Sequence, residues 1–197
     1  MSAASPRQPG YPVDPLFVER WSPRAFTGEA IAESELMRLL EAARWAPSAF
    51  NAQPWRFVYA RRDTASWQPL FELLLEGNRS WVQRAAALLA VVSKETRGAD
   101  GGEVPSRTHS FDTGAAWMSV ALQAHLAGWA AHGMAGFELE RARTVLGVPA
   151  GYRIEAMVAI GRQGDKSVLT ESQQQRELPS ARRPLGESVA EGRFIWS

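Results

Sequence analysis

The apolar run from Ala85 to Ser93 constrains the fold of this chain more than any other feature of its sequence. The run has the length of a strand and no polar alternation, so it predicts a strand buried on both faces of a sheet. Two further strands are predicted at Trp55 to Ala60, which is rich in aromatic and β-branched residues, and at Tyr152 to Ile160, which ends at Gly161. With 197 residues, 45% of them apolar, the chain can bury a sizeable core in one domain.

Helical spacing of leucines and alanines predicts a first helix that begins near Ser34, the expected N-cap, and ends before Pro47. Further helices are predicted at 67–74, at 112–130, which is rich in small residues, and at 138–146. The segments between them are expected to be irregular: a loop at 48–54, a flexible connection at 98–103, a turn at 133–136 and a polar surface excursion at 163–179. This order of elements predicts an α+β fold, with a mixed sheet and a dominant helical layer.

The two ends of the chain differ from the middle. Residues 1–16 contain regularly spaced prolines and no apolar run, which predicts an extended arm and excludes a signal peptide. Residues 17–197 are expected to form a single domain. Its tail, 182–197, has too few apolar residues for a core and must pack on its own domain or on another subunit. The apolar stretch Phe111 to Ala131 contains Asp112 and His125, so it predicts a buried helix rather than a membrane span, and a cytoplasmic protein is expected.

Several classes of function are excluded by composition. The formal net charge is +1, so no whole-molecule field attracts nucleic acid or an anionic membrane. Cysteine is absent, which excludes disulfides, thiolate metal sites and a thiol nucleophile. His125 and His132 could share a helix face, but they have no third ligand nearby, so no metal site is expected. The sequence contains neither a nucleophile elbow nor a phosphate-binding glycine loop, and its carboxylates form no acid/base pair.

Polar clusters in loops remain. Arg20 and Arg24 flank Trp21, Ser22 and Pro23, and two guanidinium groups with a hydroxyl can clamp an anion such as phosphate. Taken alone, this cluster is about twice as well explained by a surface arginine pair at a serine turn as by an anion-binding site. The loop at 47–55 carries serine, asparagine and glutamine between prolines, and it could present fixed donors to a heteroaromatic ring. The loop at 179–184 is again basic, although taken alone it is far better explained as a solvated charge pair.

In this order, the pieces resemble the FMN-dependent nitroreductase family over nearly the whole chain, from about Phe17 to Phe194. The resemblance is carried by the segments Arg20-Trp-Ser-Pro-Arg-Ala-Phe26, Glu41-Ala-Ala-Arg-Trp-Ala-Pro-Ser48, Asn51-Ala-Gln-Pro-Trp-Arg-Phe57, Asp112-Thr-Gly-Ala-Ala-Trp117, Gly133-Met-Ala-Gly-Phe137, Glu155-Ala-Met-Val-Ala-Ile-Gly161 and Arg182-Arg-Pro-Leu185. It implies a nitroreductase-like mixed β-sheet flanked by helices, in an intertwined homodimer that binds FMN at the subunit interface, with the C-terminal tail packed on the partner.

The resemblance also implies roles for single residues. Arg20, Ser22 and Arg182 are expected to bind the FMN phosphate, Trp21 to lie beside the ribityl chain, and Arg24 to lie near the pyrimidine edge of the flavin. The remaining cofactor-binding residues are expected to be Ser48 and Asn51 from the other subunit, Gln53 as support for their loop, Asn78 at the pyrimidine end, and the backbone of Ala135 and Gly136 near flavin N5.

Two positions depart from the pattern. Some family members carry lysine three residues after the asparagine that Asn78 matches, where this chain has Trp81. Some carry lysine two residues before the arginine that Arg182 matches, where this chain has Ser180. The chain also lacks the long insertions that form substrate lids in larger members.

The resemblance implies an enzyme whose chemistry resides in the flavin, which explains the missing acid/base pair. NADH or NADPH would reduce the flavin, and a nitroaromatic, quinone or similar small acceptor would reoxidise it in a ping-pong cycle. Two alternatives stay open: a reductase of another small molecule on the same scaffold, by dehalogenation or enal or aldehyde reduction, and a non-enzymatic flavin store or redox regulator.

Overall fold

The protein is built around a four-stranded sheet whose strand order is β1-β2-β6-β5. A computed structural model describes residues 7–196. The strands are β1 (Trp55–Arg61), β2 (Ala87–Lys94), β6 (Tyr152–Gly161) and β5 (Ala130–Met134), and each pairs antiparallel with its neighbour. The expected α+β class is confirmed, but the prediction of a mixed sheet is wrong for these strands. Every neighbouring pair of strands in this sheet runs in opposite directions, so the sheet is antiparallel and not mixed.

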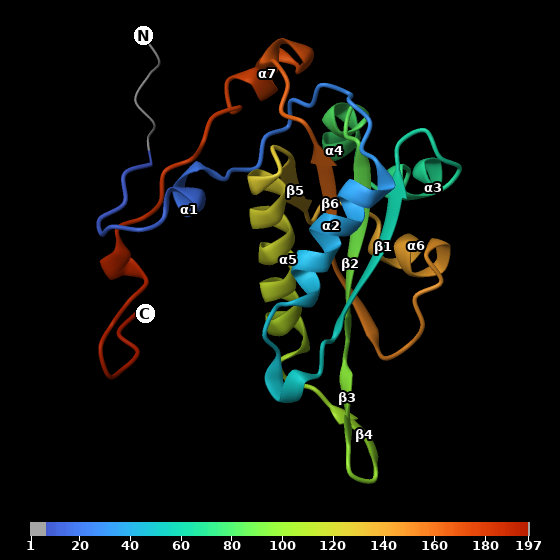
Figure 1. Cartoon of the computed structure of the whole chain (residues 1–197), viewed down its shortest axis with the longest axis vertical. Helices are drawn as coiled ribbons and strands as arrows, with labels where there is room; N and C mark the ends of the chain where they lie inside the picture. The colour runs from blue at the N-terminus through green and yellow to red at the C-terminus, as the bar shows by residue number, and fades with distance from the viewer. Residues whose placement is uncertain (1–6, 197) are drawn as a thin grey trace.

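Helices cover both faces of the sheet (Figure 1). One face packs against α2 (Glu33–Arg44) and α5 (His109–Leu126), and the other against α3 (Trp67–Phe71), α4 (Glu76–Val82) and α6 (Leu139–Val145). Strand β2 shows how the sequence divides the core. Its Leu89 and Val91 pack with the α2–α5 side, whereas Leu88 and Ala90 pack with the α3–α4 side, as the two-residue period of a strand requires. The prediction that this strand is buried on both faces is confirmed.

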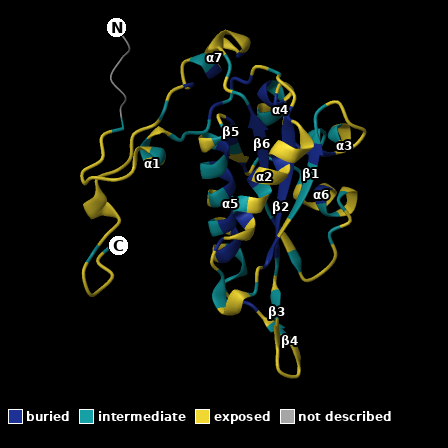
Figure 2. Cartoon of the chain, in the orientation of Figure 1, coloured by how far each residue is buried: buried dark blue, intermediate teal, exposed yellow. Residues whose placement is uncertain are grey.

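The remaining elements lie outside these layers. A hairpin of β3 (Thr96–Ala99) and β4 (Gly102–Pro105) projects from one end, where a flexible connection was expected. The short helices are α1 (Pro15–Glu19), α7 (Glu171–Gln174) and the 3-10 turns η1 (Ala49–Asn51), η2 (Lys166–Val168) and η3 (Leu185–Glu187). Residues 7–14 of the N-terminal arm and residues 182–196 of the C-terminal tail run together, away from the sheet, and this part of the tail is almost entirely exposed (Figure 2). Residues 1–6 of the predicted arm lie outside the described residues.

Several predicted boundaries were wrong. Ser34 is not the N-cap of α2, because Ala32 occupies that position. The helix predicted at 67–74 ends at Phe71, and it is followed by α4, which the sequence did not predict. Helix α5 ends at Leu126 rather than Ala130, because Gly128 adopts a left-handed φ of 73° that ends the helix.

The same helix end changes the interpretation of the residues after it. The chain enters β5 at once, so Gly133 and Met134 belong to a strand and not to a turn. His132 is in β5 and His125 in α5, so the two histidines do not share a helix face. Within residues 7–196 there is no group of three or more potential metal ligands, and no helix is both long and apolar enough to cross a membrane.

Candidate functional site

A cavity of about 280 Å³ beside β5 gathers the basic residues of distant segments. Five arginines line it, and they come from the N-terminal arm, the segment after α1, the end of α7 and the C-terminal tail: Arg7, Arg20, Arg24, Arg176 and Arg182. The other lining residues are Trp21, Ser22, His132, Leu178 and Ser180. We call this the arginine cavity. It contains five of the residues predicted from the sequence: Arg20, Trp21, Ser22, Arg24 and Arg182.

Arg20 is the C-cap of α1, and the chain leaves it in an extended conformation toward Ser22. Its Nη1 donates to Ser22 Oγ at 3.4 Å, while its Nε is buried and has no hydrogen-bond partner in the described part of the chain. Burial, and next the charge of Arg182, lower the pKa of Arg20. A buried donor without a partner is costly, so this guanidinium suits an anionic ligand.

Glu177 fixes the backbone that follows Ser22. It is only 6% exposed, and its Oε1 accepts the backbone N–H groups of Arg24, at 2.6 Å, and Ala25, at 2.8 Å. Arg24 Nη1 lies 3.8 Å from Glu177 Oε2. The carboxylate therefore holds Arg24 at the cavity and offsets part of its charge.

His132 contacts the same segment of backbone. Its Nδ1 lies 2.9 Å from the carbonyl oxygen of Pro23, and its ring centroid lies 4.6 Å from that of Trp81. Burial is the main cause that lowers the pKa of His132, and this favours the uncharged imidazole. Trp81 itself is 3% exposed, so the position where some relatives carry lysine belongs to the core here.

Strand β5 leads from the arginine cavity to a second predicted contact. Gly136 lies four residues beyond His132, or about 13 Å along an extended chain. The carbonyl oxygen of Gly136 accepts from Asn78 Nδ2 at 2.9 Å. A Cβ at position 136 would come within 2.8 Å of that nitrogen, so this close approach requires glycine. The structure therefore brings Asn78 and Gly136 together, with the exposed Ala135 beside them.

The loop that carries Ser48, Asn51 and Gln53 lies elsewhere. Ser48 Oγ accepts from the backbone N–H of Gln53 at 3.0 Å, and Gln53 Nε2 donates to the carbonyl oxygen of Asn51 at 3.2 Å. Phe50, Asn51 and Gln53 all have positive φ angles, between 47° and 55°. Non-glycine residues in this region are strained, and such strain gathers at binding sites.

Asp112, in the first turn of α5, holds this loop. Its side chain is buried, and its Oδ2 accepts the backbone N–H of Ala49 at 3.1 Å and the hydroxyl of Thr108 at 3.0 Å. Near the last turn of α5, His125 Nε2 lies 3.9 Å from Glu19 Oε2, beside Arg20. Thirteen residues of helix separate Asp112 from His125, which corresponds to about 20 Å. One chain therefore does not bring Ser48, Asn51 and Gln53 to the arginine cavity.

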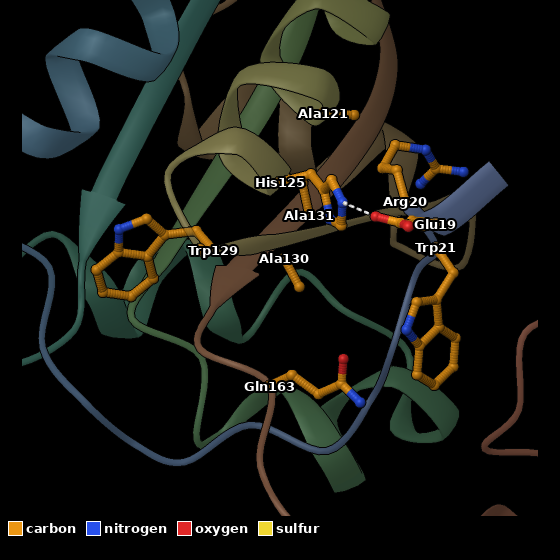
Figure 3. Close-up of a pocket in the computed structure, with 10 residues that line it drawn as sticks. Glu19, Arg20, Trp21, Ala121, His125, Trp129, Ala130, Ala131 and Gln163 are labelled. Atoms are coloured by element: carbon orange, nitrogen blue, oxygen red, sulfur yellow. Dashed lines mark ion pairs between the residues drawn. The ribbon is translucent and has the colours of Figure 1, made fainter. Parts of the chain in front are cut away.

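A second cavity, of about 290 Å³, adjoins the first and shares Arg20 and Trp21 with it. Figure 3 shows Trp129 and Trp21 on opposite sides of this space, with the Glu19–His125 pair between the segments that carry them. Three successive residues of β5 line these cavities: Ala130 and Ala131 line the second cavity, and His132 lines the arginine cavity.

Sequence reasoning missed four polar residues at the arginine cavity, namely Arg7, His132, Arg176 and Ser180, of which Ser180 was noted only as a departure. Single arginines in an arm or after a short helix carry no motif, so no signal in the sequence pointed to Arg7 or Arg176. His132 carries no motif either, because the strand that positions it depends on pairing with β6.

Comparisons with known proteins identify the family and the fold. The model of the nitroreductase family matches residues 18–162. A solved structure described as an oxidoreductase containing FMN is 50% identical, covers 100% of both chains and superposes with a TM-score of 0.94. A putative nitroreductase in complex with FMN from Desulfovibrio desulfuricans is 26% identical, covers 91% of this chain and 96% of its own, and has a TM-score of 0.68.

A curated relative extends the comparison to activity. A protein named NADH dehydrogenase from Thermus thermophilus is 29% identical over an alignment 199 residues long, gaps included. The alignment covers 85% of this chain and 90% of that protein. The family match covers well over half of the chain and includes β1, β2, β5, β6 and α5. The chain therefore belongs to the nitroreductase family.

Proposed function

We propose that this protein binds FMN and is an oxidoreductase that takes electrons from NADH or NADPH and passes them to small acceptors, such as nitroaromatics or quinones. The observation that carries the proposal is the arginine cavity, with its buried and unpartnered Arg20 Nε. A phosphate monoester carries up to about two negative charges, and charge-assisted hydrogen bonds to guanidinium groups are the strong ones. The FMN named in the descriptions of two related structures supplies such a phosphate.

In this proposal, Arg20, Ser22 and Arg182 bind the phosphate, and Trp21 lies beside the ribityl chain. The flavin ring would lie along β5, toward Asn78 and the backbone of Ala135 and Gly136. Support for this direction comes from the order of contacts along the chain: the arginine cavity borders His132, and the Asn78–Gly136 hydrogen bond lies four residues further on.

When bound, FMN would supply a ring able to accept a hydride at N5 and to reduce a second substrate, as a ping-pong cycle requires. The chain's own residues position and tune that ring. A cation at its pyrimidine edge, which we assign to Arg24, would stabilise the negative charge that reduction places there and so raise the flavin potential. Glu177 limits this effect by offsetting part of the charge while holding Arg24 in place.

We further propose that the site is completed by a second copy of the chain. Helix α5 exposes the apolar side chains of Phe111, Met118 and Leu126, at i, i+7 and i+15. In an antiparallel two-fold interface between two such helices, the first turn of one lies beside the last turn of the other. That arrangement would bring the partner's loop with Ser48, Asn51 and Gln53 to the arginine cavity, across the 20 Å or so that separates them in one chain.

The test is anaerobic reduction of the purified, FMN-loaded protein. We expect NADH or NADPH to bleach the visible flavin absorbance completely, and a nitroaromatic or quinone to restore it. Bleaching without reoxidation by these acceptors would direct the search to other reducible small molecules. A bound flavin that neither nicotinamide bleaches would contradict the proposed enzyme and favour a flavin store or regulator.

A further inference from the structure

The N-terminal arm brings one arginine into the arginine cavity from outside the family match, which begins at Val18. Arg7 Nε donates to the carbonyl oxygen of Ser180 in the C-terminal tail at 3.0 Å. Its Nη1 donates to the carbonyl oxygens of Val18, at 2.9 Å, and Arg20, at 2.6 Å. One side chain thus joins the arm, the end of α1 and the tail at the place where all three border the cavity.

The charges around Arg7 explain why such a contact would matter. Burial, followed by the charges of Arg182 and Arg20, lowers the pKa of Arg7. Arg20 is itself affected in the same way by Arg182. Guanidinium groups stay protonated in proteins, so the three positive charges repel one another, and a shared anion relieves that repulsion. Carbonyl oxygens hold the Arg7 fork in place without removing its positive charge.

Ser180 accepts hydrogen bonds from both Arg7 and Arg182. Ser180 contributes no charge, and its carbonyl and hydroxyl oxygens accept from Arg182 Nη1 at 3.2 and 3.1 Å. The same residue is the anchor for Arg7 Nε. Ser180 therefore orients two guanidinium groups, one from each end of the chain, toward a single cavity.

We propose that Arg7 is a further ligand of the FMN phosphate, and that the N-terminal arm is part of the cofactor site. This inference rests on the proposed function. It gives the arm a role in retaining the cofactor: phosphate binding links Arg7 to Arg20 and Arg182 and thereby holds the arm and the tail against α1.

The experiment compares FMN with riboflavin, which lacks the phosphate, in fluorescence titrations of the full-length protein freed of flavin. The variants are Arg7→Met, Arg20→Met and Arg183→Met. Arg183 is the matched control, because it is adjacent to Arg182, but its side chain is 86% exposed and faces Glu187 at 4.0 Å. We expect Arg7→Met and Arg20→Met each to weaken FMN binding by about tenfold or more, with riboflavin binding unchanged and Arg183→Met close to the unsubstituted protein.

The two proposals fail in different ways. Loss of FMN affinity in Arg20→Met but not in Arg7→Met would overturn the role of Arg7 and leave the phosphate site in place. Unchanged FMN affinity in both variants would overturn the phosphate site as well. Equal losses for FMN and riboflavin in Arg7→Met would show that the arm only supports the fold.

A second measurement needs no substitution. Trypsin cleaves after arginine, so cleavage after Arg7 in the natural chain reports whether the arm is held in place. We expect FMN to slow this cleavage and riboflavin to leave it unchanged. Equal cleavage rates with and without FMN would contradict the proposal, even if Arg7→Met failed to fold.

Discussion

His132 and Glu177 hold the segment from Ser22 to Ala25 from two sides, although neither belongs to a motif. The carboxylate accepts the backbone N–H groups of Arg24 and Ala25, and the imidazole contacts the carbonyl oxygen of Pro23, which precedes them. A loop fixed in this way presents Arg24 and Ser22 to the cavity without needing a regular element. Positioning at the residue scale thus depends on the buried Glu177 and the half-buried His132, which come from distant parts of the chain.

A pH dependence of stability follows from His132. Its pKa in the folded chain lies below the ordinary value of 6.5, chiefly through burial, with Arg24 acting in the same direction and Glu177 opposing it. Below that ordinary value, His132 becomes protonated in the unfolded chain at a pH at which it stays neutral in the folded chain. The free energy of unfolding therefore falls as the pH drops through this window, by at most about 1.4 kcal/mol per pH unit.

The control for this prediction is His132→Asn, whose amide can still donate to the carbonyl of Pro23 but does not titrate. Urea unfolding at about pH 7 and about pH 5 should give a smaller difference for this variant than for the unsubstituted chain. Identical pH slopes for the two proteins would show that His132 does not cause the dependence.

Sequence motifs located some residues of the site and not others, and the reason is physical. Arg20, Ser22, Arg24 and Arg182 lie in short, ordered patterns, and all four line one cavity. Arg7 is positioned by contacts that include Val18, Arg20 and Ser180, and these depend on how the two ends of the chain meet. No local sequence pattern specifies a contact between the two ends of the chain.

At the scale of elements, α5 connects two parts of the proposed site. Its first turn fixes the loop at 48–53 through Asp112, and its last turn lies beside Glu19 and the segment that carries Arg20. Most of its inward face is small, with Ala116, Ala121 and Ala124 buried against the sheet and α2, so the helix packs closely. A shift of this helix would therefore move both groups of residues.

The loop at 48–53 should loosen when Asp112 is replaced. Asp112→Ala leaves the N–H of Ala49 without its acceptor and removes support from three residues with strained φ angles. We expect the free energy of unfolding to fall by about 1–3 kcal/mol in a urea titration. Asp112→Asn, which keeps an acceptor oxygen, should lose less.

The matched control is Asp100→Ala, at the exposed turn between β3 and β4. It removes a carboxylate from an exposed turn residue and should stay close to the unsubstituted protein. Equal stability of Asp112→Ala and Asp100→Ala would contradict the role that we give to Asp112.

Periodicity predicted the elements that bury a regular face. The strands at Trp55, Ala85 and Tyr152 and the helix at 36–43 appear close to their expected bounds, because apolar residues repeat at the period of each element. Strand β5 was missed, since its short run at an edge of the sheet contains His132 and Gly133. Its existence depends on pairing with β6, a contact that the local sequence does not express.

At the scale of the whole molecule, the chain combines a packed body with two exposed ends. The body has cores on both faces of the sheet, whereas the arm and tail leave Val189, Phe194 and Ile195 more than half exposed. Apolar side chains on an extended tail, together with those on α5, are typical of surfaces that a partner covers. A second copy would cover them and supply the loop that one chain lacks at its own arginine cavity.

Native mass spectrometry of the full-length protein, incubated with FMN and freed of excess, tests this account most directly because it reads assembly and ligand together. We predict one main species at twice the mass of the chain, carrying two FMN molecules. A monomer, or a dimer that retains no FMN, would contradict a cofactor site built jointly by two copies of this chain.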